Sequence, residues 1–184
     1  MQDKKNRPLN LTPKRKLGII NKIDVSKYID SHFDWRQMEE IRLGLESEID
    51  VSIYADLKYD SGQMEQLRLG LIKGLNVSVY SNICYNAEQM YQIRQGLESG
   101  IDVSVYTNPQ YTYIEMRLLR NALKQDNNAI LYLKYNYSHQ QIREICLGIE
   151  SGIDVSIYAN PEYTEYQMKQ KRLGLESAEI IQEL

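Results

Sequence analysis

The 184-residue chain has few cysteines and histidines, and this scarcity excludes two kinds of site. Its two cysteines, Cys84 and Cys146, form no CxxC motif, and there are only two histidines. A disulfide framework and a recognisable zinc site are therefore excluded, and unpaired cysteines are typical of a reducing compartment. We predict a cytoplasmic protein that holds no metal ion.

Excess charge and long apolar runs are also missing. The net charge is −3, which gives no bulk electrostatic attraction to nucleic acid or to an anionic membrane. No apolar run approaches the ~20 residues that span a bilayer, so we predict no membrane contact. Residues 1–10 carry basic side chains with no apolar segment behind them, and we predict a flexible basic tail there. Residues 11–184 are predicted to form one domain, an array of repeats.

The sequence lacks the motifs that usually carry catalysis. It contains no phosphate-binding glycine loop, no metal-ligand cluster and no paired-carboxylate site. Cys146 follows His139 on one predicted helix at a distance of ~10 Å, which is too far for a nucleophile and its base. We predict that the protein is not an enzyme and uses no cofactor.

What the chain does contain is a repeat with a period of 26 residues and no insertions. Each unit begins at an aromatic residue, which we number position 1. These residues are Phe33, Tyr59, Tyr85, Tyr111, Tyr137 and Tyr163. A decayed unit precedes them at residues 16–28. A fixed period implies a fixed geometry, so we predict a solenoid of about six to seven units, each stacked on its neighbours.

Two signals delimit a helix in the first half of each unit. Position 2 is a helix N-cap residue in every copy, and position 5 is Gln or Glu, so the two predict a capping box. Position 16 is glycine at Gly74, Gly100 and Gly152, which suits the left-handed residue that ends a helix.

The second half of each unit, IDVSIYANP in its fullest form, has two interpretations. An Asp or Asn cap and a closing proline such as Pro161 favour a short second helix. The alternation of Ile153, Val155 and Ile157 with polar residues instead favours a strand, in an α/β solenoid of the leucine-rich type. We predict the all-α fold, an αα-solenoid of two-helix repeats, with the α/β solenoid as the alternative.

Tyrosine is the dominant aromatic residue, with 15 copies against one Phe and one Trp. Most of the tyrosines occupy positions 1 and 22 of the units. Repetition at packing positions predicts core residues with a hydrated hydroxyl group, not a platform for stacking bases.

A helical wheel divides the first helix into an invariant and a variable face. Positions 5, 6, 9, 12 and 13 barely change and are predicted to form the stacking core. Positions 3, 4, 7, 8, 11 and 14 lie opposite and vary, either because they bind a partner or because a solvated face has drifted. Exposed aromatic residues such as Trp35 and Tyr113 favour a partner, because they are enriched at interface hot spots. The candidate partner-binding residues are Trp35, Glu39, Tyr91, Tyr113, Arg117, His139 and Arg143.

Position 10 forms a ladder of arginines: Arg42, Arg68, Arg94, Arg120 and Arg172. Guanidinium groups spaced by the helix packing distance of ~10 Å could follow a phosphate backbone or an acidic partner. In the structural alternative, the pairs Arg42–Glu46, Arg94–Glu98 and Arg172–Glu176 form one turn apart. Caps such as Asp50 in neighbouring units would then accept further bonds.

The fourth unit departs most from the pattern. Ala122 replaces the glycine of position 12, and residues 125–130 and 133–136 lack the glycine and proline of the other copies. Two interpretations stay open: tolerated decay and a functional bend.

Residues 89–111, with the pattern QMxQIRxGLESGIDVSVYxNPxY, resemble a short helical repeat of uncharacterised bacterial and mobile-element proteins. The resemblance covers nearly the whole chain and implies no activity. It suggests a phage or mobile-element protein that binds and blocks a host protein. We therefore expect a non-catalytic protein-binding scaffold. The alternatives are nucleic-acid or nucleotide binding through the arginine ladder, which the net charge does not support, and a self-assembling structural array.

Overall fold

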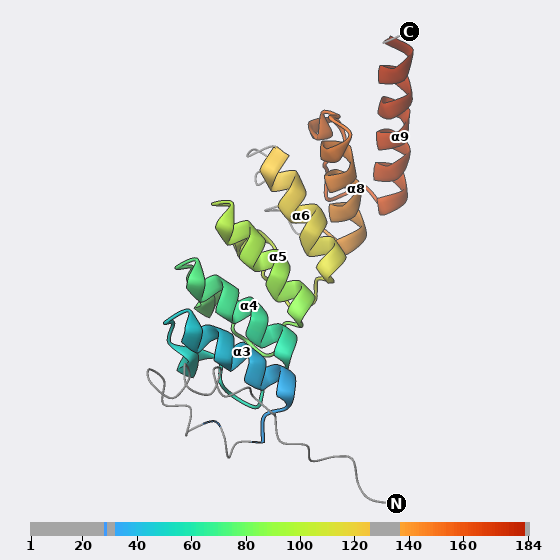
Figure 1. Ribbon diagram of the computed structural model, residues 1–184. Helices are drawn as coiled ribbons and strands as arrows, with labels where there is room; N and C mark the ends of the chain where they lie inside the picture. Colours follow the sequence, from blue (N-terminus) through green and yellow to red (C-terminus); the bar gives the residue numbers. More distant parts are fainter. Residues whose placement is uncertain (1–27, 29–31, 126–136, 183–184) are drawn as a thin grey trace, which may run out of the picture.

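The computed structural model describes residue 28, residues 32–125 and residues 137–182. Six α-helices and four short 3₁₀-helices follow one another in this part of the chain (Figure 1). The α-helices are α3 (Trp35–Glu46), α4 (Ser61–Ile72), α5 (Ala87–Glu98), α6 (Tyr113–Gln125), α8 (His139–Glu150) and α9 (Glu165–Gln182). The 3₁₀-helices are η1 (Val51–Ile53), η2 (Val77–Val79), η3 (Val103–Val105) and η4 (Val155–Ile157).

The α-helices lie side by side in the order of the sequence (Figure 1). Each packs against the next, and each 3₁₀-helix packs against the α-helix that precedes it. No strand occurs in the described residues, so the fold is all-α and the strand interpretation of the IDVS segments is wrong.

The second half of each unit is shorter than the predicted second helix. It is a single turn of three residues, in which the Asp50 carboxylate accepts hydrogen bonds from the backbone and the hydroxyl group of Ser52. Tyr54 then leaves the helical conformation with φ −130°, and its side chain is fully buried. The turn therefore ends where the tyrosine enters the core.

Every described α-helix begins at a capping box, as the sequence predicts. At the first one, the backbone N–H of Gln37 donates to the Asp34 carboxylate, and the backbone N–H of Asp34 donates to the Gln37 side chain, both at 2.9 Å. The same reciprocal bonds join Asp60 to Gln63, Asn86 to Gln89, Thr112 to Glu115, Ser138 to Gln141 and Thr164 to Gln167. Because the box fixes where each helix starts, it also fixes the register between neighbouring helices.

Glycine at position 16 ends three of the helices, also as predicted. Gly74, Gly100 and Gly152 have φ of +68°, +69° and +77°, which side chains other than glycine rarely adopt. After α5, the N–H of Gly100 donates to the Leu97 carbonyl and the N–H of Ile101 to the Gly96 carbonyl, the two bonds of a Schellman ending. In α9, position 16 is Ala178, and the helix continues to Gln182.

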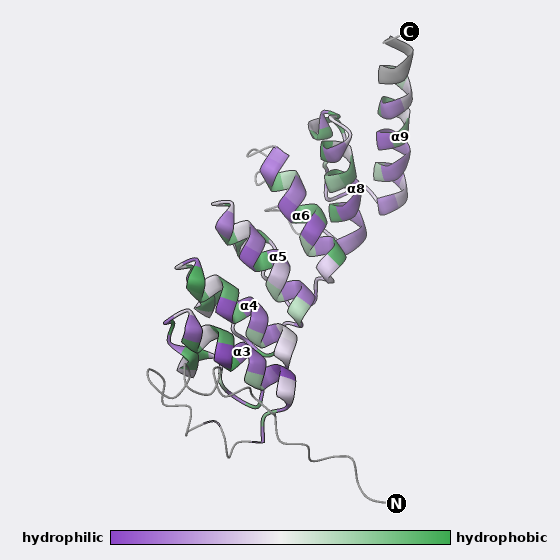
Figure 2. Ribbon diagram, in the orientation of Figure 1, coloured by the Kyte–Doolittle hydropathy of each residue, from purple (hydrophilic) through white to green (hydrophobic). Residues whose placement is uncertain are grey.

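The core runs along the array as one cluster of methionine, branched aliphatic and tyrosine side chains. Hydrophobic and hydrophilic residues alternate around each helix in Figure 2, as expected for helices with one packed face. The predicted core positions 6, 9 and 12 are buried except at Met38, which is partly buried, and at Lys171 and Gly174 of α9, which are exposed. Tyr54, Tyr80, Tyr106 and Tyr158 at position 22 have no exposed surface. The Tyr54 hydroxyl donates to the Glu40 carbonyl at 2.9 Å, so the buried polar group is satisfied.

Glutamine at position 5 joins each unit to the next. Its carbonyl oxygen serves the capping box, while its Nε2 donates to the carbonyl of position 1 in the following unit. These bonds run from Gln37 to Tyr59, Gln63 to Tyr85, Gln89 to Tyr111 and Gln141 to Tyr163, at 2.5–2.7 Å. One side chain therefore both starts a helix and holds the next unit in place.

Some predictions fall outside the described residues. These are the basic tail at residues 1–10, most of the decayed unit at residues 16–28, and the variant segment of the fourth unit at residues 126–136.

Candidate functional site

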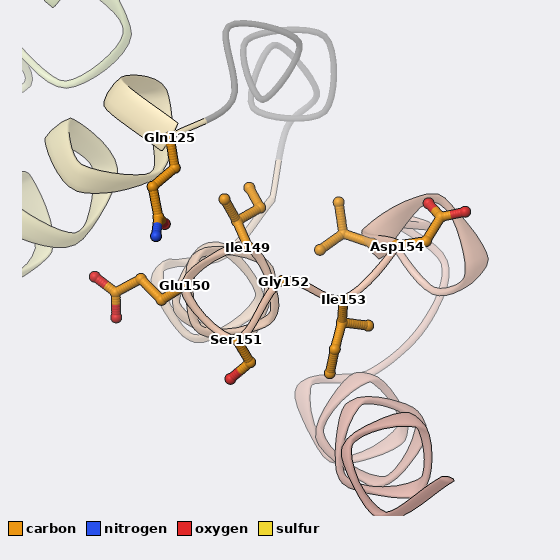
Figure 3. A pocket seen from close by; sticks show the side chains of 8 residues that line it. Gln125, Ile149, Glu150, Ser151, Gly152, Ile153 and Asp154 are labelled. Carbon is orange, nitrogen blue, oxygen red and sulfur yellow. The ribbon is translucent and has the colours of Figure 1, made fainter. Parts of the chain in front are cut away.

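A hollow of about 590 Å³ lies between the end of α6 and the turn that follows α8 (Figure 3). Its lining residues are Gln125, Ile149, Glu150, Ser151, Gly152, Ile153, Asp154 and Val155. The carboxylates of Glu150 and Asp154 project to opposite sides in Figure 3, and the described lining residues include no His, Cys or Lys. These described residues therefore provide neither a paired acid and base nor a nucleophile with a base.

The cysteines differ in their surroundings. Cys84 is exposed, whereas Cys146 is buried in α8. Burial raises the pKa of the Cys146 thiol to about 12, so this thiol stays protonated and unreactive at neutral pH. Among the described residues, no group of three or more His, Cys, Asp or Glu side chains could hold a metal ion.

The exposed surface of the α-helices consists of positions 3, 4, 7, 11 and 14, and we call it the outer face. Several large aromatic side chains lie on it. Trp35 is 67% exposed, Tyr91 41% and Tyr113 42%, and Tyr166 on α9 is 67% exposed. Trp35 and Tyr113 lie in the first turn of their helices, so the sequence placed these two side chains correctly.

The charged candidates on the outer face fall into two groups. Glu39 forms an ion pair with Arg42 at 2.6 Å on the same helix. Arg117 and Arg143 are exposed, and neither has an ion-pair partner among the described residues. Within the described residues, the outer face therefore offers two arginines that are not ion-paired, on α6 and α8.

His139 differs from the other candidates because it is only partly exposed and already has partners. Its Nδ1 lies 3.2 Å from the Glu115 carboxylate of α6, and its ring packs against Tyr111 at 4.8 Å between centroids. Glu115 occupies position 5, where the other joined units have a glutamine that donates to the next unit. A carboxylate cannot donate, so the contact with His139 joins α6 to α8 instead.

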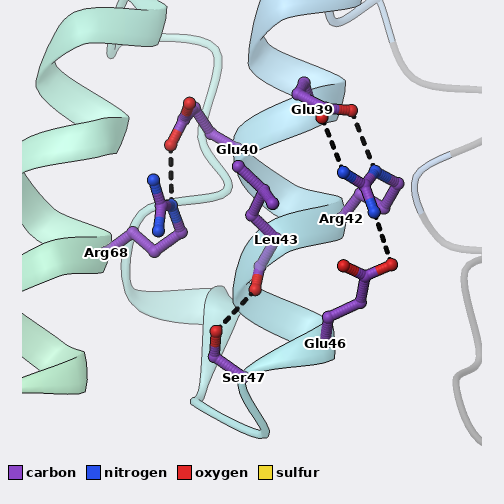
Figure 4. Close-up of polar contacts among 7 residues, drawn as sticks. All are labelled: Glu39, Glu40, Arg42, Leu43, Glu46, Ser47 and Arg68. Carbon is purple, nitrogen blue, oxygen red and sulfur yellow. Dashed lines mark hydrogen bonds and ion pairs between the residues drawn. The ribbon is translucent and has the colours of Figure 1, made fainter.

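Three arginines of the ladder donate across helix interfaces, as Figure 4 shows for Arg68, whereas Arg42 pairs with Glu39 and Glu46 of its own helix. Arg68 donates to Glu40 of α3 at 2.7 Å, Arg94 to Gln66 of α4 at 3.0 Å and Arg172 to Glu144 of α8 at 2.9 Å. In each case the acceptor is position 8 of the preceding unit. The expected acceptors, caps such as Asp50, do not receive these bonds, because the interface places position 8 opposite the arginine.

This geometry corrects the helical wheel at one position. Position 8 was assigned to the variable face, yet Gln66 and Gln92 are buried at 7% and 5% exposure. The wheel considers one helix alone, whereas in the structure position 8 meets position 10 of the following helix, which covers it. The predicted pairs one turn apart do occur: Arg42–Glu46, Arg94–Glu98 and Arg172–Glu176.

Arg120 is the exception in the ladder. By analogy it should donate to Gln92 of α5, but both the Arg120 Nε and the Gln92 Oε1 are buried without a hydrogen-bond partner. Among the described residues, the Arg120 guanidinium donates to Asn121, at 3.5 Å. The interface between α5 and α6 therefore lacks a bond that three other interfaces have.

A second exposed apolar row lies on the 3₁₀-helices and the turns after them, and it was not predicted from the sequence. Ile53 is 41% exposed and Ile157 53%, both at position 21, and Leu57 and Ile83 at position 25 are 53% and 55% exposed. The available signal was the regular alternation of apolar and polar residues in IDVSIY, which was weighed only as support for the alternative strand.

None of the described helices is both long and apolar enough to cross a membrane. Comparison of the chain with protein-family models, with curated proteins and with solved structures finds no match. Function therefore has to be inferred from the surface of this chain alone.

Proposed function

We propose that the protein is a non-catalytic helical-repeat scaffold that binds another protein through its outer face. The observation that carries the proposal is that the packing contacts repeat along the array whereas the exposed side chains differ between units. Capping boxes, inter-unit glutamine bonds and buried tyrosines repeat from unit to unit, whereas Trp35, Tyr91 and Tyr113 project from the frame at 41–67% exposure. Large exposed aromatic side chains are common anchors of protein interfaces.

The proposal includes the arrangement of the repeats. We infer that the units continue as one αα-solenoid of about six to seven repeats, with the outer face as its continuous surface. In support, the same pairs of positions recur at most of the described interfaces: position 5 donates to position 1 of the next unit four times, and position 8 accepts from position 10 of the next unit three times. The resemblance to mobile-element repeats further suggests a cytoplasmic bacterial or phage protein that blocks a host protein.

Binding of nucleic acid through the arginine ladder has less support. The side chains of Arg68, Arg94 and Arg172 are 8–11% exposed, and each donates to the preceding helix. A phosphate backbone would have to displace these bonds before it gained new ones. The ladder therefore fits a structural role better.

Capture from a bacterial lysate on the immobilised protein tests the proposed binding. We expect the double variant Trp35→Ala/Tyr113→Ala to lose proteins that the unaltered chain retains, as identified by mass spectrometry. The matched control is Ile53→Ala/Ile157→Ala, which removes exposed apolar surface from the 3₁₀-helices. If the control loses the proteins and the aromatic variant keeps them, the binding face is the row at position 21 and the outer-face assignment is wrong.

A further inference from the structure

We propose that the outer face of α6, α8 and α9 binds an acidic segment in the polyproline II conformation, with a carboxylate at every third residue. This inference rests on the proposed protein-binding function and names the chemistry of the partner. The surface concerned has a basic row, which we define as Arg117 on α6, Arg143 on α8 and Lys169 on α9.

The basic row is built from the same position of three consecutive helices. All three residues occupy position 7 and are exposed. In the N-terminal half of the array the same position holds Glu39 and Glu65, so the charge on the outer face changes sign along the array. A partner with one acidic stretch would be attracted to the C-terminal half and repelled from the N-terminal half.

The row is free to bind because most carboxylates near it are already engaged. Glu115 contacts His139, and Glu144 and Glu176 both accept from Arg172. None of the three basic residues has an ion-pair partner in the part of the chain that the structure describes. Glu165 lies one turn before Lys169 on α9, but it forms no ion pair with that lysine.

Exposed aromatic residues accompany the basic row. Tyr113 lies one helical turn before Arg117, and Tyr166 lies one turn before Lys169, so each pair shares one side of its helix. Tyr113 is 42% exposed, Tyr166 67% and the neighbouring Ile114 45%. Grooves lined by aromatic side chains are the usual binding surface for proline-rich segments in the polyproline II conformation.

The spacing expected between side chains on packed helices matches that conformation. Packed helices lie ~8–10 Å apart, so equivalent side chains on neighbouring helices repeat at about that distance. Polyproline II rises ~3.1 Å per residue with three residues per turn, so every third side chain returns to one face after ~9 Å. An extended β-strand places its third side chain on the opposite face and does not match.

A nucleic acid is a poorer fit to the same surface. The row is short, the chain has a net charge of −3, and position 7 becomes acidic towards the N-terminus. A phosphate backbone longer than a few nucleotides would therefore meet repulsion beyond α6. Single-stranded nucleic acid is accordingly the competing outcome in the test.

Fluorescence anisotropy of a labelled (Glu-Pro-Pro)₄ peptide with the full chain tests the inference. The control peptide has the same composition with its glutamates in one block. We expect the alternating peptide to bind more tightly than the control peptide, and its binding to weaken as salt concentration rises. Arg143→Glu should weaken binding about tenfold, because it removes one attraction and adds one repulsion. Lys73→Glu, the same charge reversal at the exposed C-cap residue that follows α4, should change it less than about twofold.

Arg143→Gln serves as a second variant that removes the charge without reversing it, and circular dichroism verifies that each variant is folded. Equal binding of the two peptides, or equal effects of the Arg143 and Lys73 reversals, would overturn the inference. Tighter binding of single-stranded oligothymidylate than of the peptide would overturn it too. If the peptide does not bind but lysate capture still depends on Trp35 and Tyr113, the basic-row inference fails and the protein-binding function stands.

Discussion

Glycine occupies position 12 at Gly44, Gly70, Gly96 and Gly148 for a packing reason that the structure reveals. A Cβ added at Gly96 would lie 1.8 Å from the Tyr106 hydroxyl oxygen, and one at Gly44 would lie 1.8 Å from that of Tyr54. The tyrosine of the second half of each unit thus lies directly over the helix of the first half. Glycine and tyrosine form one contact, although they are separated in sequence by the turn.

Gly96→Ala should therefore lower the free energy of unfolding by about 2 kcal/mol, because the new methyl group forces Tyr106 out of its buried position. Gly174→Ala is the matched control at the same position of α9, where an added Cβ meets nothing within 4 Å. It should stabilise the protein by up to ~1 kcal/mol through helix propensity. Urea unfolding followed by circular dichroism measures both, and equal losses would contradict the tyrosine contact.

The buried Gln92 Oε1 and Arg120 Nε, which have no hydrogen-bond partner, give a second prediction about stability. Gln92→Glu should stabilise the protein by about 1 kcal/mol, because it supplies the acceptor that Glu40 and Glu144 supply at other interfaces. Gln170→Glu, at the exposed position 8 of α9, should change stability by less than ~0.5 kcal/mol. Destabilisation by Gln92→Glu would mean that the cost of burying the carboxylate exceeds the gain from pairing it.

The helices were more predictable than the contacts between them. Asp34 with Gln37, and Gly100 with Ile101, mark the ends of helices through local bonds, so the sequence alone located those ends. The acceptors of the ladder were not predictable, because Glu40 meets Arg68 only after two helices pack at a particular rotation. The 3₁₀-helices were predictable only in part. Their Asp or Asn cap marks where they start, but a single turn is too short to show a periodic pattern.

α9 differs from the other helices at the position that faces a following unit. Position 9 is Ile41, Leu67, Ile93, Leu119 and Ile145 in the earlier helices, and each of these residues is at most 1% exposed. In α9 it is Lys171, which is exposed and lies over the Tyr163 ring at 5.0 Å. A polar side chain at a stacking position is how repeat arrays prevent end-to-end association.

Lys171→Ile should therefore promote self-association through α9. Multi-angle light scattering should show a mass that rises with protein concentration, because the stacking surface becomes apolar. Lys169→Ile makes the same change on the outer face of α9 and should leave the mass at any given concentration unaltered. If the unaltered chain already assembles end to end, Lys171 does not act as a cap, and the self-assembling alternative gains support.

Because of its buried tyrosines, the array as a whole should lose stability at alkaline pH. Burial raises the pKa of Tyr54, Tyr80, Tyr106 and Tyr158 above the ordinary value of 10.0, and it raises that of Cys146 from 9.0 to about 12. The unfolded chain therefore releases these protons at lower pH than the folded chain does. Their contribution to stability is complete below pH ~9 and is lost as the pH rises above it.

We expect the urea midpoint to fall steadily above pH ~9–10. Tyr106→Phe should make this fall shallower, because one buried hydroxyl no longer titrates on unfolding. Tyr113→Phe, at an exposed tyrosine, should leave the slope unchanged. Equal slopes in both variants and the unaltered protein would show that the buried hydroxyl groups do not cause the alkaline loss.

For the candidate site, the sequence could indicate which positions vary, but not which of those positions are available. Trp35 and Tyr113 were expected to be exposed and are, whereas His139 is engaged by Glu115, and Gln66 and Gln92 lie under a neighbouring helix. Ile53 and Ile157 show the reverse case: their position hardly changes between units, which suggests a core residue, yet both side chains are exposed. Repetition in the sequence reports equivalent surroundings, which are buried at some positions and exposed at others.

The equivalence of the units predicts that one of them can be removed. Deletion of residues 59–84 joins the first unit to the third and preserves both interface contacts. Gln37 then lies opposite the carbonyl of Tyr85, and Glu40 lies opposite Arg94 in place of Gln66. We expect a folded and shorter protein whose helical circular dichroism per residue is unchanged, with stability reduced by the loss of one nearest-neighbour interface.

A deletion of residues 59–78, which breaks the period, should instead unfold the units on both sides of the junction, because it misplaces every position-5 and position-8 contact there. If the variant that lacks residues 59–78 instead unfolds cooperatively and keeps the native helix content, in-register stacking does not hold the array together.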